Sequence, residues 1–548
     1  MTFQFPTRIV YSENLENAES LLREKPLQIG LSETDCAVLR GKACVIFDFG
    51  KELVGGARIL TFLSGARARK SQTVRLRFGE SVSETCSEIG EHYTETKKLG
   101  FATNDHSIRD FCVDLQDFSD MRFAQTGFRF LRIDTLSDDY EITLKSVVAA
   151  SETDTRKQLG FFTCDDQLVN DIFDTAAHTI RLCLQNGYFW DGIKRDRLVW
   201  IGDLYPEMRA AQCIFGDVPE TLNSVKFIMD QSPLPMWMNG IAAYSLWWLC
   251  ILAQEYQVNG NKDLFNAYLP YTNELLKVFS DYVTEDGQIA MNWNFIDWPT
   301  NYEEGQPIEK KYDSATGVAY LARVTMQKII PMLQDFNQDT SVAEDILRRL
   351  LKSNAQVKKY KQIAGLGAWS GDLSENNKKV LLDGGAKGLS TFMSYPILKG
   401  VAAYGEYEAA LSMMKEYYGG MLSVGATSFW EDFDVEWLEN CFRIDEMPVE
   451  GKVDIHGDKG AFCYLGFRHS LCHGWSAGVI PYLYETVVGV QQVGVGEKQF
   501  RITPNMSGLK HIKASYPTKF GNIEIEHTLQ ADGSVKTDVT APKEVEIL

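Results

Sequence analysis

The sequence DDQLVNDIFDTAAHTIRLCLQ, residues 165–185, decides the fold class, because the spacing of the apolar residues changes there. Its apolar residues recur four positions apart, at Leu168, Ile172, Ala176 and Ile180. This spacing places them on one face of a helix. Asp165 or Asp166 stands just before the first of them as a natural N-cap. The segment therefore predicts an amphipathic helix at the start of a helical region.

The helical period continues along the chain. It recurs at roughly 206–216, 219–230, 241–257, 263–283, 312–336, 340–362, 390–402, 405–418 and 470–488. No repeat of fixed length links these stretches, which argues against a solenoid. Many helices joined by loops rich in Gly, Trp and Asp fit a closed ring of helices, and we predict that fold for this region.

On both sides of the helical region the apolar residues alternate instead. Upstream, from about residue 42 to 150, runs such as TVRLRFGE and FRFLRIDTL are separated by Gly, Ser, Asn and Asp, which is typical of a β-sandwich. After Gly489 the alternation returns in KQFRITP and GNIEIEHTLQ. We therefore expect an N-terminal β-sandwich at 1–152, a helical domain at 153–489 and a small C-terminal β domain at 490–548.

Composition and charge restrict the function. The chain has 548 residues, of which 45% are hydrophobic and 24% charged, as in a globular protein. Its 74 Asp+Glu against 55 Lys+Arg give a net charge of −19. A field of this sign repels nucleic acid and anionic membranes, so neither is an expected partner. A neutral or cationic substrate is favoured, and nothing in the sequence fixes the oligomeric state.

Targeting and redox features indicate the cytoplasm. The N-terminal residues show no cationic segment followed by an apolar one, so no signal peptide is expected. The apolar run at 241–253 is shorter than the roughly 20 residues that span a bilayer and predicts a buried helix. The 11 cysteines show no CxxC pair or zinc-type spacing, so we expect them reduced and packed as small hydrophobic residues.

The tryptophans indicate where the chemistry lies. All 11 fall between Trp190 and Trp475, outside both predicted β regions. Three groups stand beside carboxylates, namely Trp200–Asp203, Trp293–Asp297–Trp298 and Trp430–Glu431. Aromatic rings stack on the C–H faces of sugars while carboxylates bind the hydroxyls, so this pairing favours a carbohydrate site. The alternative is that the tryptophans only fill a large helical core.

The densest polar segment is YFWDGIKRDRLVWIGDLYPE, residues 188–207. It places Asp191, Arg195, Asp196 and Asp203 close together in the chain. A neighbouring cation lowers the pKa of a carboxyl group and burial raises it. Such a segment can hold one carboxylate ionised and another protonated, as acid/base chemistry requires. The alternative is an ion-pair network that braces a loop.

Two further segments carry candidate groups. GATSFWEDFD, residues 425–434, places Glu431 after two aromatic residues. FRHSLCHGWSAG, residues 467–478, holds His469 and His473 four positions apart, a weak metal pair because no third ligand is near. His473 beside Trp475 fits a hydrogen-bond donor to a sugar hydroxyl. No dinucleotide, phosphate-loop or nucleophile-elbow motif is present, so no cofactor and no metal is expected.

The run DGIKRDRLVWIGD, residues 191–203, resembles the α-L-rhamnosidases of glycoside hydrolase family 78. The resemblance continues, in the order of that family, at 161–172, 297–298, 425–431 and 470–478, and it covers roughly residues 42 to 548. It implies an (α/α)6 barrel with β-sandwich domains on either side. It also implies the hydrolysis of terminal α-L-rhamnosides with inversion, without a cofactor.

The resemblance also implies roles for residues of this chain. Asp196 stands at the position of the general acid and Glu431 at that of the general base. We expect the sugar to be bound by Asp191, Arg195, Trp200, Asp203, Asp297, Trp298, Trp430, His473 and Trp475. One departure matters, because the family usually has Glu at the acid position and Asp196 is shorter by about 1.5 Å. Glu207 is a possible substitute acid.

Two other interpretations of the sequence stay open. Another sugar-active helical toroid, such as a uronyl hydrolase or a polysaccharide lyase, would share the aromatic and acidic segments, although the net charge of −19 argues against a polyuronide substrate. A carbohydrate-binding protein with impaired catalysis would keep the aromatic pocket. In that case the replacement of the usual Glu by Asp196 is evidence of lost catalysis.

Overall fold

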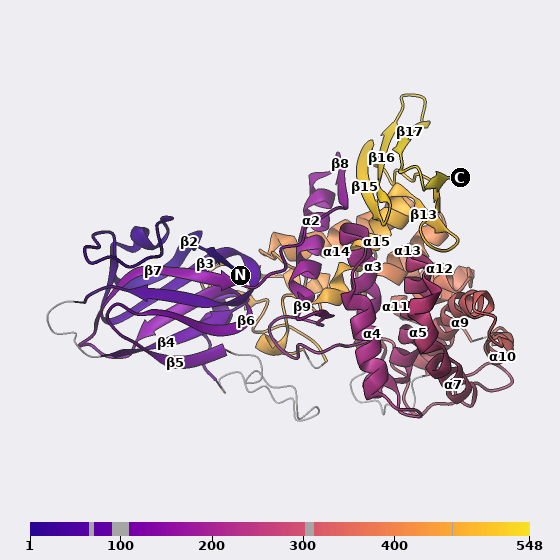
Figure 1. The fold of residues 1–548 in the computed structure, drawn as a ribbon, viewed down its shortest axis with the longest axis horizontal. Helices are drawn as coiled ribbons and strands as arrows, with labels where there is room; N and C mark the ends of the chain where they lie inside the picture. The colour runs from indigo at the N-terminus through magenta and orange to yellow at the C-terminus, as the bar shows by residue number, and fades with distance from the viewer. Residues whose placement is uncertain (65–70, 90–108, 302–311, 354, 463) are drawn as a thin grey trace.

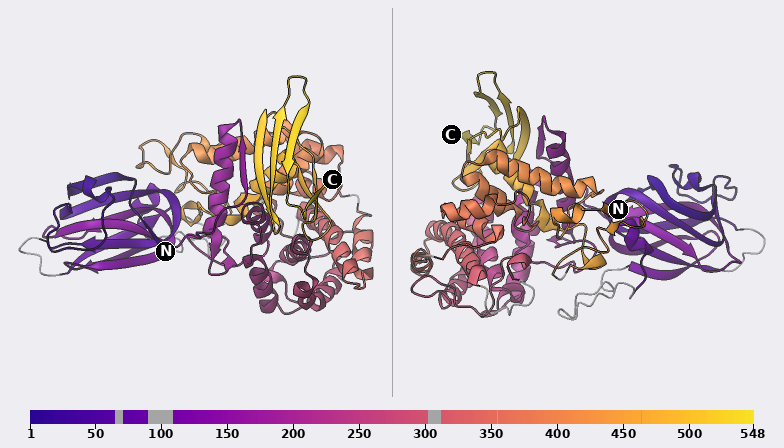
Figure 2. Two further views of the ribbon diagram at one scale, coloured as in Figure 1. Left: turned by 45° about the horizontal axis from the view of Figure 1, so that its top comes forward. Right: turned by 180° about the vertical axis from the view of Figure 1, so that it is seen from behind.

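The computed structural model describes residues 1–64, 71–89, 109–301, 312–353, 355–462 and 464–548. Figure 1 shows three parts along the chain: a lobe of strands at the N-terminus, a helical body, and a second group of strands that stands on the helical body at the C-terminus. The two further views in Figure 2 show the same arrangement. The predicted order of a β region, a helical region and a second β region is thus confirmed.

The N-terminal lobe is a seven-stranded sheet in the order β1-β7-β3-β6-β4-β5, with β2 paired to β3. Its strands are β1 (Thr2–Gln4), β2 (Arg8–Glu16), β3 (Ala37–Thr61), β4 (Gln72–Gly79), β5 (Arg109–Leu115), β6 (Asp120–Thr135) and β7 (Glu141–Ser151). In β4 the alternation predicted from TVRLRFGE is present, since Val74, Leu76 and Phe78 are buried in the core of the lobe. A short helix, α1 (Val82–Cys86), follows β4.

The helical body begins with α2 (Gln167–Cys183), as the apolar spacing predicts. Asp166 is the N-cap, and its side chain accepts a hydrogen bond from the backbone N–H of Leu168. The body continues with α3 (Leu204–Phe215), α4 (Glu220–Gln231), α5 (Ala242–Asn259), α6 (Lys262–Phe265), α7 (Leu269–Ser280), α8 (Trp298–Asn301), α9 (Tyr312–Asp335), α10 (Ser341–Leu350), α11 (Lys361–Trp369), α12 (Glu375–Leu382), α13 (Ser394–Ala403), α14 (Tyr407–Ser423) and α15 (Val479–Tyr482).

Packing between these helices closes on itself. Helix α3 packs on α5, α5 on α9, α9 on α11, α11 on α13, α13 on α15, and α15 returns to α3. Helix α5 is apolar on all sides and is buried along almost its whole length, as expected of a helix with neighbours all round. Among the described residues, no helix is long and apolar enough to cross a membrane.

The helices of the structure differ in several places from those predicted. The stretch 340–362 is two helices, because α10 ends at Leu350 and α11 begins only at Lys361 after the mostly polar run KSNAQVKK. Helix α12 was not predicted, since ENNKKVLL offers few apolar positions. The stretch 470–488 begins as a loop and continues with the 3₁₀ turn η8 (Gly474–Gly478), α15 and a π-helical turn, because its glycines interrupt a regular helix.

The C-terminal region forms two small sheets. One contains β13 (Val490–Val493), β14 (Gln499–Ile502) and β18 (Glu546–Ile547). The other has the order β17-β16-β15-β8, from β17 (Val535–Thr540), β16 (Gly521–Leu529), β15 (His511–Thr518) and β8 (Phe161–Cys164). Strand β8 directly precedes α2 and pairs antiparallel with β15, so the C-terminal sheet recruits a strand from the start of the helical region.

Leu249 lies in α5 with its side chain fully buried, and its truncation to alanine should lower the free energy of unfolding by about 2–5 kcal/mol. Leu264 in α6 is 47% exposed, and the same truncation there should cost within about 0.5 kcal/mol. Urea denaturation followed by tryptophan fluorescence measures both, since all the tryptophans lie between residues 190 and 475. Equal losses in the two variants would contradict the packing of α5.

Candidate active site

A cavity of 290 Å³ in the helical body gathers acidic, basic and aromatic side chains from distant parts of the chain. Of the residues that the sequence predicted for the site, it is lined by Asp191, Arg195, Asp196, Trp200, Asp203, Trp298, Glu431, His473 and Trp475. The loop before α3, the segment before α8 and the two loops around Glu431 and His473 therefore meet at one place.

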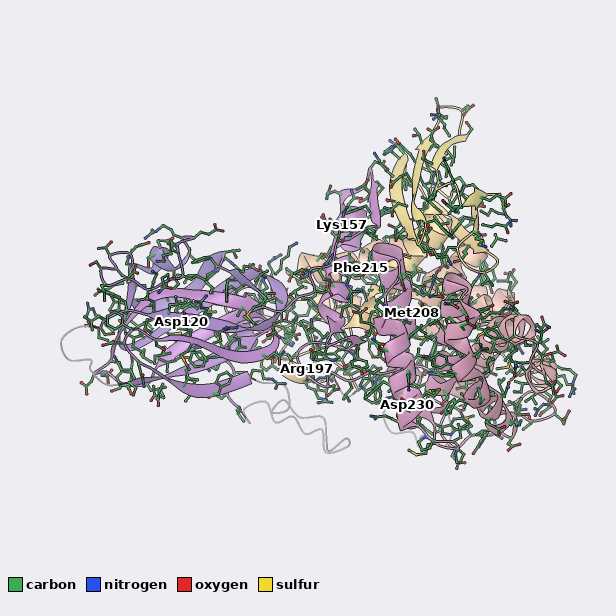
Figure 3. All side chains as sticks on the ribbon, viewed as in Figure 1. Asp120, Lys157, Arg197, Met208, Phe215 and Asp230 are labelled. Carbon is green, nitrogen blue, oxygen red and sulfur yellow. The ribbon has the colours of Figure 1, made fainter. Side chains whose placement is uncertain are left out.

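The loop 191–203 reaches the cavity through a strained turn. Asp196 and Arg197 both have left-handed backbone conformations, with φ of 57° and 56°. For residues other than glycine such a conformation costs about 1–3 kcal/mol, and it persists where the surroundings impose it. The Nε of Arg197 donates to the carbonyl of Ile193 at 3.0 Å, and its Nη2 donates to the carbonyl of Gln125 in β6 at 2.6 Å. Figure 3 shows Arg197 at the junction of the N-terminal lobe and the helical body.

The guanidinium of Arg195 joins the two candidate catalytic carboxylates. Its Nη1 donates to Oδ2 of Asp196 at 2.6 Å, and its Nη2 donates to Oε2 of Glu431. Its Nε donates to the carbonyl of Arg468 at 2.6 Å, which fixes the plane of the group. The side chain of Asp196 is 31% exposed and that of Glu431 only 3%. Asp196 thus stands at the open side of the cavity and Glu431 at its closed side.

Glu431 is held by neutral donors as well as by Arg195. The backbone N–H of Ser470 donates to its Oε2 at 3.1 Å, and Nε2 of His473 lies 3.5 Å from its Oε1. Burial, followed by the charge of Arg195, holds the pKa of His473 well below its usual range. The imidazole is therefore neutral, and it can donate a hydrogen bond in the cavity without adding a charge.

Asp191 and Asp203 are carboxyl groups of the cavity whose pKa values are raised. Oδ1 of Asp191 accepts from the backbone N–H of Leu198 at 2.8 Å, and Oδ1 of Asp203 accepts from the hydroxyl of Tyr244 at 2.9 Å. Burial raises the pKa of both groups well above its usual range, and the neighbouring carboxylates add to the shift. A protonated carboxyl group both donates and accepts hydrogen bonds, as recognition of a sugar hydroxyl requires.

Aromatic rings form much of the rest of the wall. Trp475 stacks on Phe392 with ring centroids 4.8 Å apart, and Trp298 contacts Phe295 edge-on at 5.4 Å. Trp293, which the sequence groups with Asp297 and Trp298, also lines the cavity. The sequence did not single out the lining residues Asn239, Tyr244, Phe295, Tyr464 and Arg468. For Phe295 a signal was present, because it lies in the segment NWNFIDWP beside the predicted Asp297.

Asp297 and Trp430, predicted as sugar-binding residues, are not among the residues that line the cavity. Oδ1 of Asp297 accepts from the backbone N–H of Trp298 at 2.8 Å and its Oδ2 accepts from Ser390, so the group orients its neighbour. Trp430 is fully buried and packs edge-on against Phe433. Each adjoins a residue that does line the cavity, Trp298 and Glu431 respectively.

Glu207 and His469 also lie behind the cavity wall. Glu207 is buried in the first turn of α3, so close to Gly474 that a Cβ at position 474 would lie 1.9 Å from its Oε1. It is therefore not placed to act as a substitute acid. His469 accepts from the backbone N–H of Asp432 at 3.0 Å. It shares no helical face with His473, since the segment between them is a loop.

The cavity thus brings buried acidic groups, an arginine and aromatic walls together on a helical body, as in the sites of carbohydrate-active enzymes. Residues 157–487 match the family model of the bacterial α-L-rhamnosidase six-hairpin glycosidase domain. Residues 489–548 match that of the bacterial α-L-rhamnosidase C-terminal domain. The chain therefore belongs to the bacterial α-L-rhamnosidase family, as the resemblance of residues 191–203 implied.

Solved structures share the fold at low sequence identity. The family 78 rhamnosidase of Bacillus sp. GL1 superposes with a TM-score of 0.73 at 18% identity, over 97% of this chain and 55% of that one. A rhamnosidase from Klebsiella oxytoca with rhamnose bound gives 0.66 at 17%, over 88% and 95%. The α-L-rhamnosidase of Streptomyces avermitilis complexed with L-rhamnose gives 0.65 at 15%, over 92% and 48%. This chain thus spans about half the length of the Bacillus and Streptomyces enzymes. No curated protein sequence matches it.

Asp297 generates a prediction for stability against pH. Burial raises its pKa from 3.8 to about 7, so the folded protein binds this proton more tightly than the unfolded chain does. Its contribution to the free energy of unfolding is therefore complete below about pH 4 and is lost as the pH rises to about 7. Asp297→Asn should remove up to about 1.4 kcal/mol per pH unit of that fall. Urea denaturation between pH 4 and 7 measures it.

Asp230 of α4 provides the control for the substitution itself, because its side chain is 53% exposed. Asp230→Asn should change the free energy of unfolding at pH 4 by no more than about 0.5 kcal/mol. A parallel curve for the parent protein and Asp297→Asn would show that Asp297 is ionised in the folded protein across this range.

Proposed function

We propose that this protein hydrolyses terminal α-L-rhamnosides with inversion at the anomeric carbon. The observation that carries the proposal is the guanidinium of Arg195, which holds the carboxylates of Asp196 and Glu431 at one cavity. Two carboxyl groups on either side of a sugar ring are what an inverting glycosidase requires. The family of the chain supports rhamnose as the sugar, and so do the rhamnose-bound relatives from Klebsiella oxytoca and Streptomyces avermitilis.

Asp196 acts as the general acid in this mechanism. It donates its proton to the glycosidic oxygen while the bond from that oxygen to the anomeric carbon breaks. Asp196 is the more exposed of the two acids, so the leaving group departs toward the open side of the cavity. Glu431 takes a proton from a water molecule as the water oxygen bonds to the anomeric carbon from the opposite face. The water requires carboxyl groups roughly 6.5–9.5 Å apart.

The remaining lining residues bind and orient the sugar. Asp191 and Asp203, whose pKa values burial raises, hydrogen-bond ring hydroxyls as donors and acceptors. Neutral His473 donates to a hydroxyl from beside Glu431. Trp200, Trp475 and the other rings of the wall cover the apolar faces of the sugar.

We also propose the finer architecture: an (α/α)6 barrel preceded by a β-sandwich, with domain limits near residues 152 and 489. The closed cycle of packing through α3, α5, α9, α11, α13 and α15 supports an inner ring of helices, against which α2, α4, α10, α12 and α14 pack. Strand β7 ends at Ser151 and β13 begins at Val490, in keeping with these limits. The description of the family as a six-hairpin glycosidase supports the same arrangement.

Removal of either acid tests the mechanism. Asp196→Asn and Glu431→Gln should each lower kcat on an aryl α-L-rhamnoside by about 10²–10⁴-fold, because each removes one proton transfer. Tryptophan fluorescence titration with L-rhamnose should still show binding. Glu436→Gln is the control, since the side chain of Glu436 is 59% exposed near the same segment, and it should keep the parent kcat.

The anomer that the parent protein releases first decides the stereochemistry. Proton NMR during hydrolysis should show β-L-rhamnose before mutarotation produces the α anomer. Release of the α anomer first would overturn inversion. Binding of rhamnose with no turnover by the parent protein would instead support a carbohydrate-binding protein.

Asp196→Glu introduces the residue that the family usually carries. The Asp196 carboxylate already lies 2.6 Å from Nη1 of Arg195. The backbone at this position is therefore close enough for the shorter side chain to reach the cavity. The extra methylene should displace the acid by about 1 Å and lower kcat by up to roughly a hundredfold, with KM almost unchanged. Steady-state kinetics measure both. A higher kcat in Asp196→Glu would show that the aspartate is too short.

A further inference from the structure

A buried ion cluster connects the N-terminal sheet to the loops that carry the candidate catalytic groups. Nζ of Lys194 lies 3.2 Å from Oε2 of Glu80, which follows β4, and 3.1 Å from Oε1 of Glu84 in α1. It also donates to the carbonyl of His469 at 3.0 Å. The three ionisable side chains are at most 1% exposed, so water screens their interaction little. Burial raises the pKa of Glu80 and that of Glu84, and the charge of Lys194 opposes both shifts.

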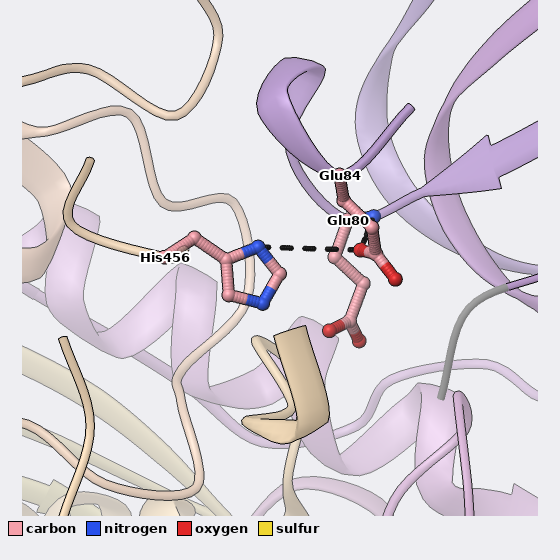
Figure 4. A group of neighbouring side chains, drawn as sticks. All are labelled: Glu80, Glu84 and His456. Carbon is pink, nitrogen blue, oxygen red and sulfur yellow. Dashed lines mark hydrogen bonds and ion pairs between the residues drawn. The ribbon is translucent and has the colours of Figure 1, made fainter. Parts of the chain in front are cut away.

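Glu80, Glu84 and His456 are grouped as the ligands of a metal ion are, since one ligand atom from each lies within 4.8 Å of the others (Figure 4). The ammonium of Lys194 already provides the cation between the two carboxylates. Both ring nitrogens of His456 are also engaged, Nδ1 with the hydroxyl of Ser81 at 2.7 Å and Nε2 with the carbonyl of His469 at 2.9 Å. The cluster is therefore an ion pair between domains.

Glu80 also holds the loop that positions Glu431. Its Oε2 accepts from the backbone N–H of Leu471 at 2.6 Å, and its Oε1 accepts from the hydroxyl of Ser470 at 3.2 Å. The backbone N–H of Ser470 donates to Oε2 of Glu431 at 3.1 Å, and the carbonyl of Ser470 accepts from the N–H of Glu431 at 3.0 Å. One residue thus separates Glu80 from the candidate general base.

Two other residues of the N-terminal sheet, outside the cluster, fix the loop that carries Arg195 and Asp196. Nη2 of Arg109, at the start of β5, donates to the carbonyl of Lys194 at 2.8 Å. The backbone N–H of Gly127 in β6 donates to the carbonyl of Ile193 at 2.9 Å. A Cβ at Gly127 would lie 2.5 Å from the side chain of Ile193, so the sheet and the loop are in direct contact. The backbone before Arg195 is therefore held by the N-terminal lobe.

We propose that Glu80 is a positioning residue for the reaction, through which the N-terminal sheet domain completes the active site. The Glu80 carboxylate ties Lys194, next to Arg195, to Ser470 and Leu471, next to Glu431. It thereby sets the position of Glu431 relative to the acid on the other loop. This inference rests on the proposed glycosidase function, because it assigns Glu80 a role in placing the general base.

Glu84 provides a matched control within the same cluster. It is buried to the same degree and lies at nearly the same distance from Nζ of Lys194. Its Oε2, however, accepts from the backbone N–H of Glu80 at 2.8 Å, inside its own domain. No hydrogen bond of Glu84 to the 470–471 loop is present among the described residues. Substitution of either glutamate by glutamine therefore removes a carboxylate beside Lys194. Only the substitution of Glu80 also changes the contact with Ser470 and Leu471.

The test compares Glu80→Gln with Glu84→Gln in the full chain. Glu80→Gln should lower kcat about tenfold or more with KM within about threefold, since misplacement of a catalytic group by about 1 Å costs up to about a hundredfold. Glu84→Gln should keep kcat within about threefold of the parent. Hydrogen exchange followed by mass spectrometry should show faster exchange in the peptide containing 468–475 in Glu80→Gln, and parent-like exchange in Glu84→Gln.

Equal kcat and equal exchange in the two variants would overturn the proposal. If thermal unfolding shows that Glu80→Gln does not fold, Glu80→Asp keeps the charge opposite Lys194 and withdraws the carboxylate from Leu471 by about 1.5 Å. It should then lose more kcat than Glu84→Asp, and equal losses would overturn the role. A parent protein inactive on rhamnosides would refute the proposed function alone, because the exchange measurement still tests whether Glu80 holds the loop.

Discussion

The active site depends on the guanidinium of Arg195. Three other carboxyl groups, Asp191, Asp203 and Glu207, are buried near the pair that it binds. Burial of an ion costs several kcal/mol, which only a partner with good geometry repays. Arg195 binds the carboxyl groups of Asp196 and Glu431, while burial raises the pKa of the other three. One cation thus separates the two groups that transfer protons in the proposed mechanism from the three buried groups around them.

Lys194, the residue before Arg195, also contacts two carboxyl groups, on the other side of the loop. Lys194 and Arg195 are adjacent in the chain, yet the first contacts Glu80 and Glu84 and the second contacts Asp196 and Glu431. Successive side chains of an irregular, extended loop can point to opposite sides. The same short segment therefore neutralises the acids of the domain interface and those of the cavity, and a shift of its backbone disturbs both.

Periodicity predicted the elements whose structure depends on local sequence. The stripe of α2, the all-round apolar α5 and the alternation of β4 each specify burial within a few residues. The pairing of β8 with β15 was not predictable, because Thr163 and Lys513 are 350 positions apart and four residues carry no pattern that selects a partner. Short polar α12 forms because its neighbours bury Leu381, which its own sequence does not show.

The site was predictable to the extent that it lies in one segment. Residues 191–203 contribute Asp191, Arg195, Asp196, Trp200 and Asp203 to the cavity, so their chemistry was visible in the sequence. Tyr244 was not visible, because it lies in an apolar helix where a tyrosine is indistinguishable from core until Asp203 is placed beside its hydroxyl. The structure places Asp297 and Trp430 outside the cavity lining, because adjacency in the chain does not decide which neighbour faces the cavity.

The N-terminal lobe and the helical body are separate segments of the chain, but residues of both hold the loops of the cavity in place. Val54 of β3 packs in one apolar cluster with Leu182, Ile193 and Cys472, and burial of such side chains provides the non-directional part of the contact. The ion pairs of Lys194 add direction, because a buried charge tolerates few arrangements of its partners. Apolar packing holds the two domains together. The ion pairs of Lys194 with Glu80 and Glu84 fix the relative position of the loops that carry the acids of the cavity.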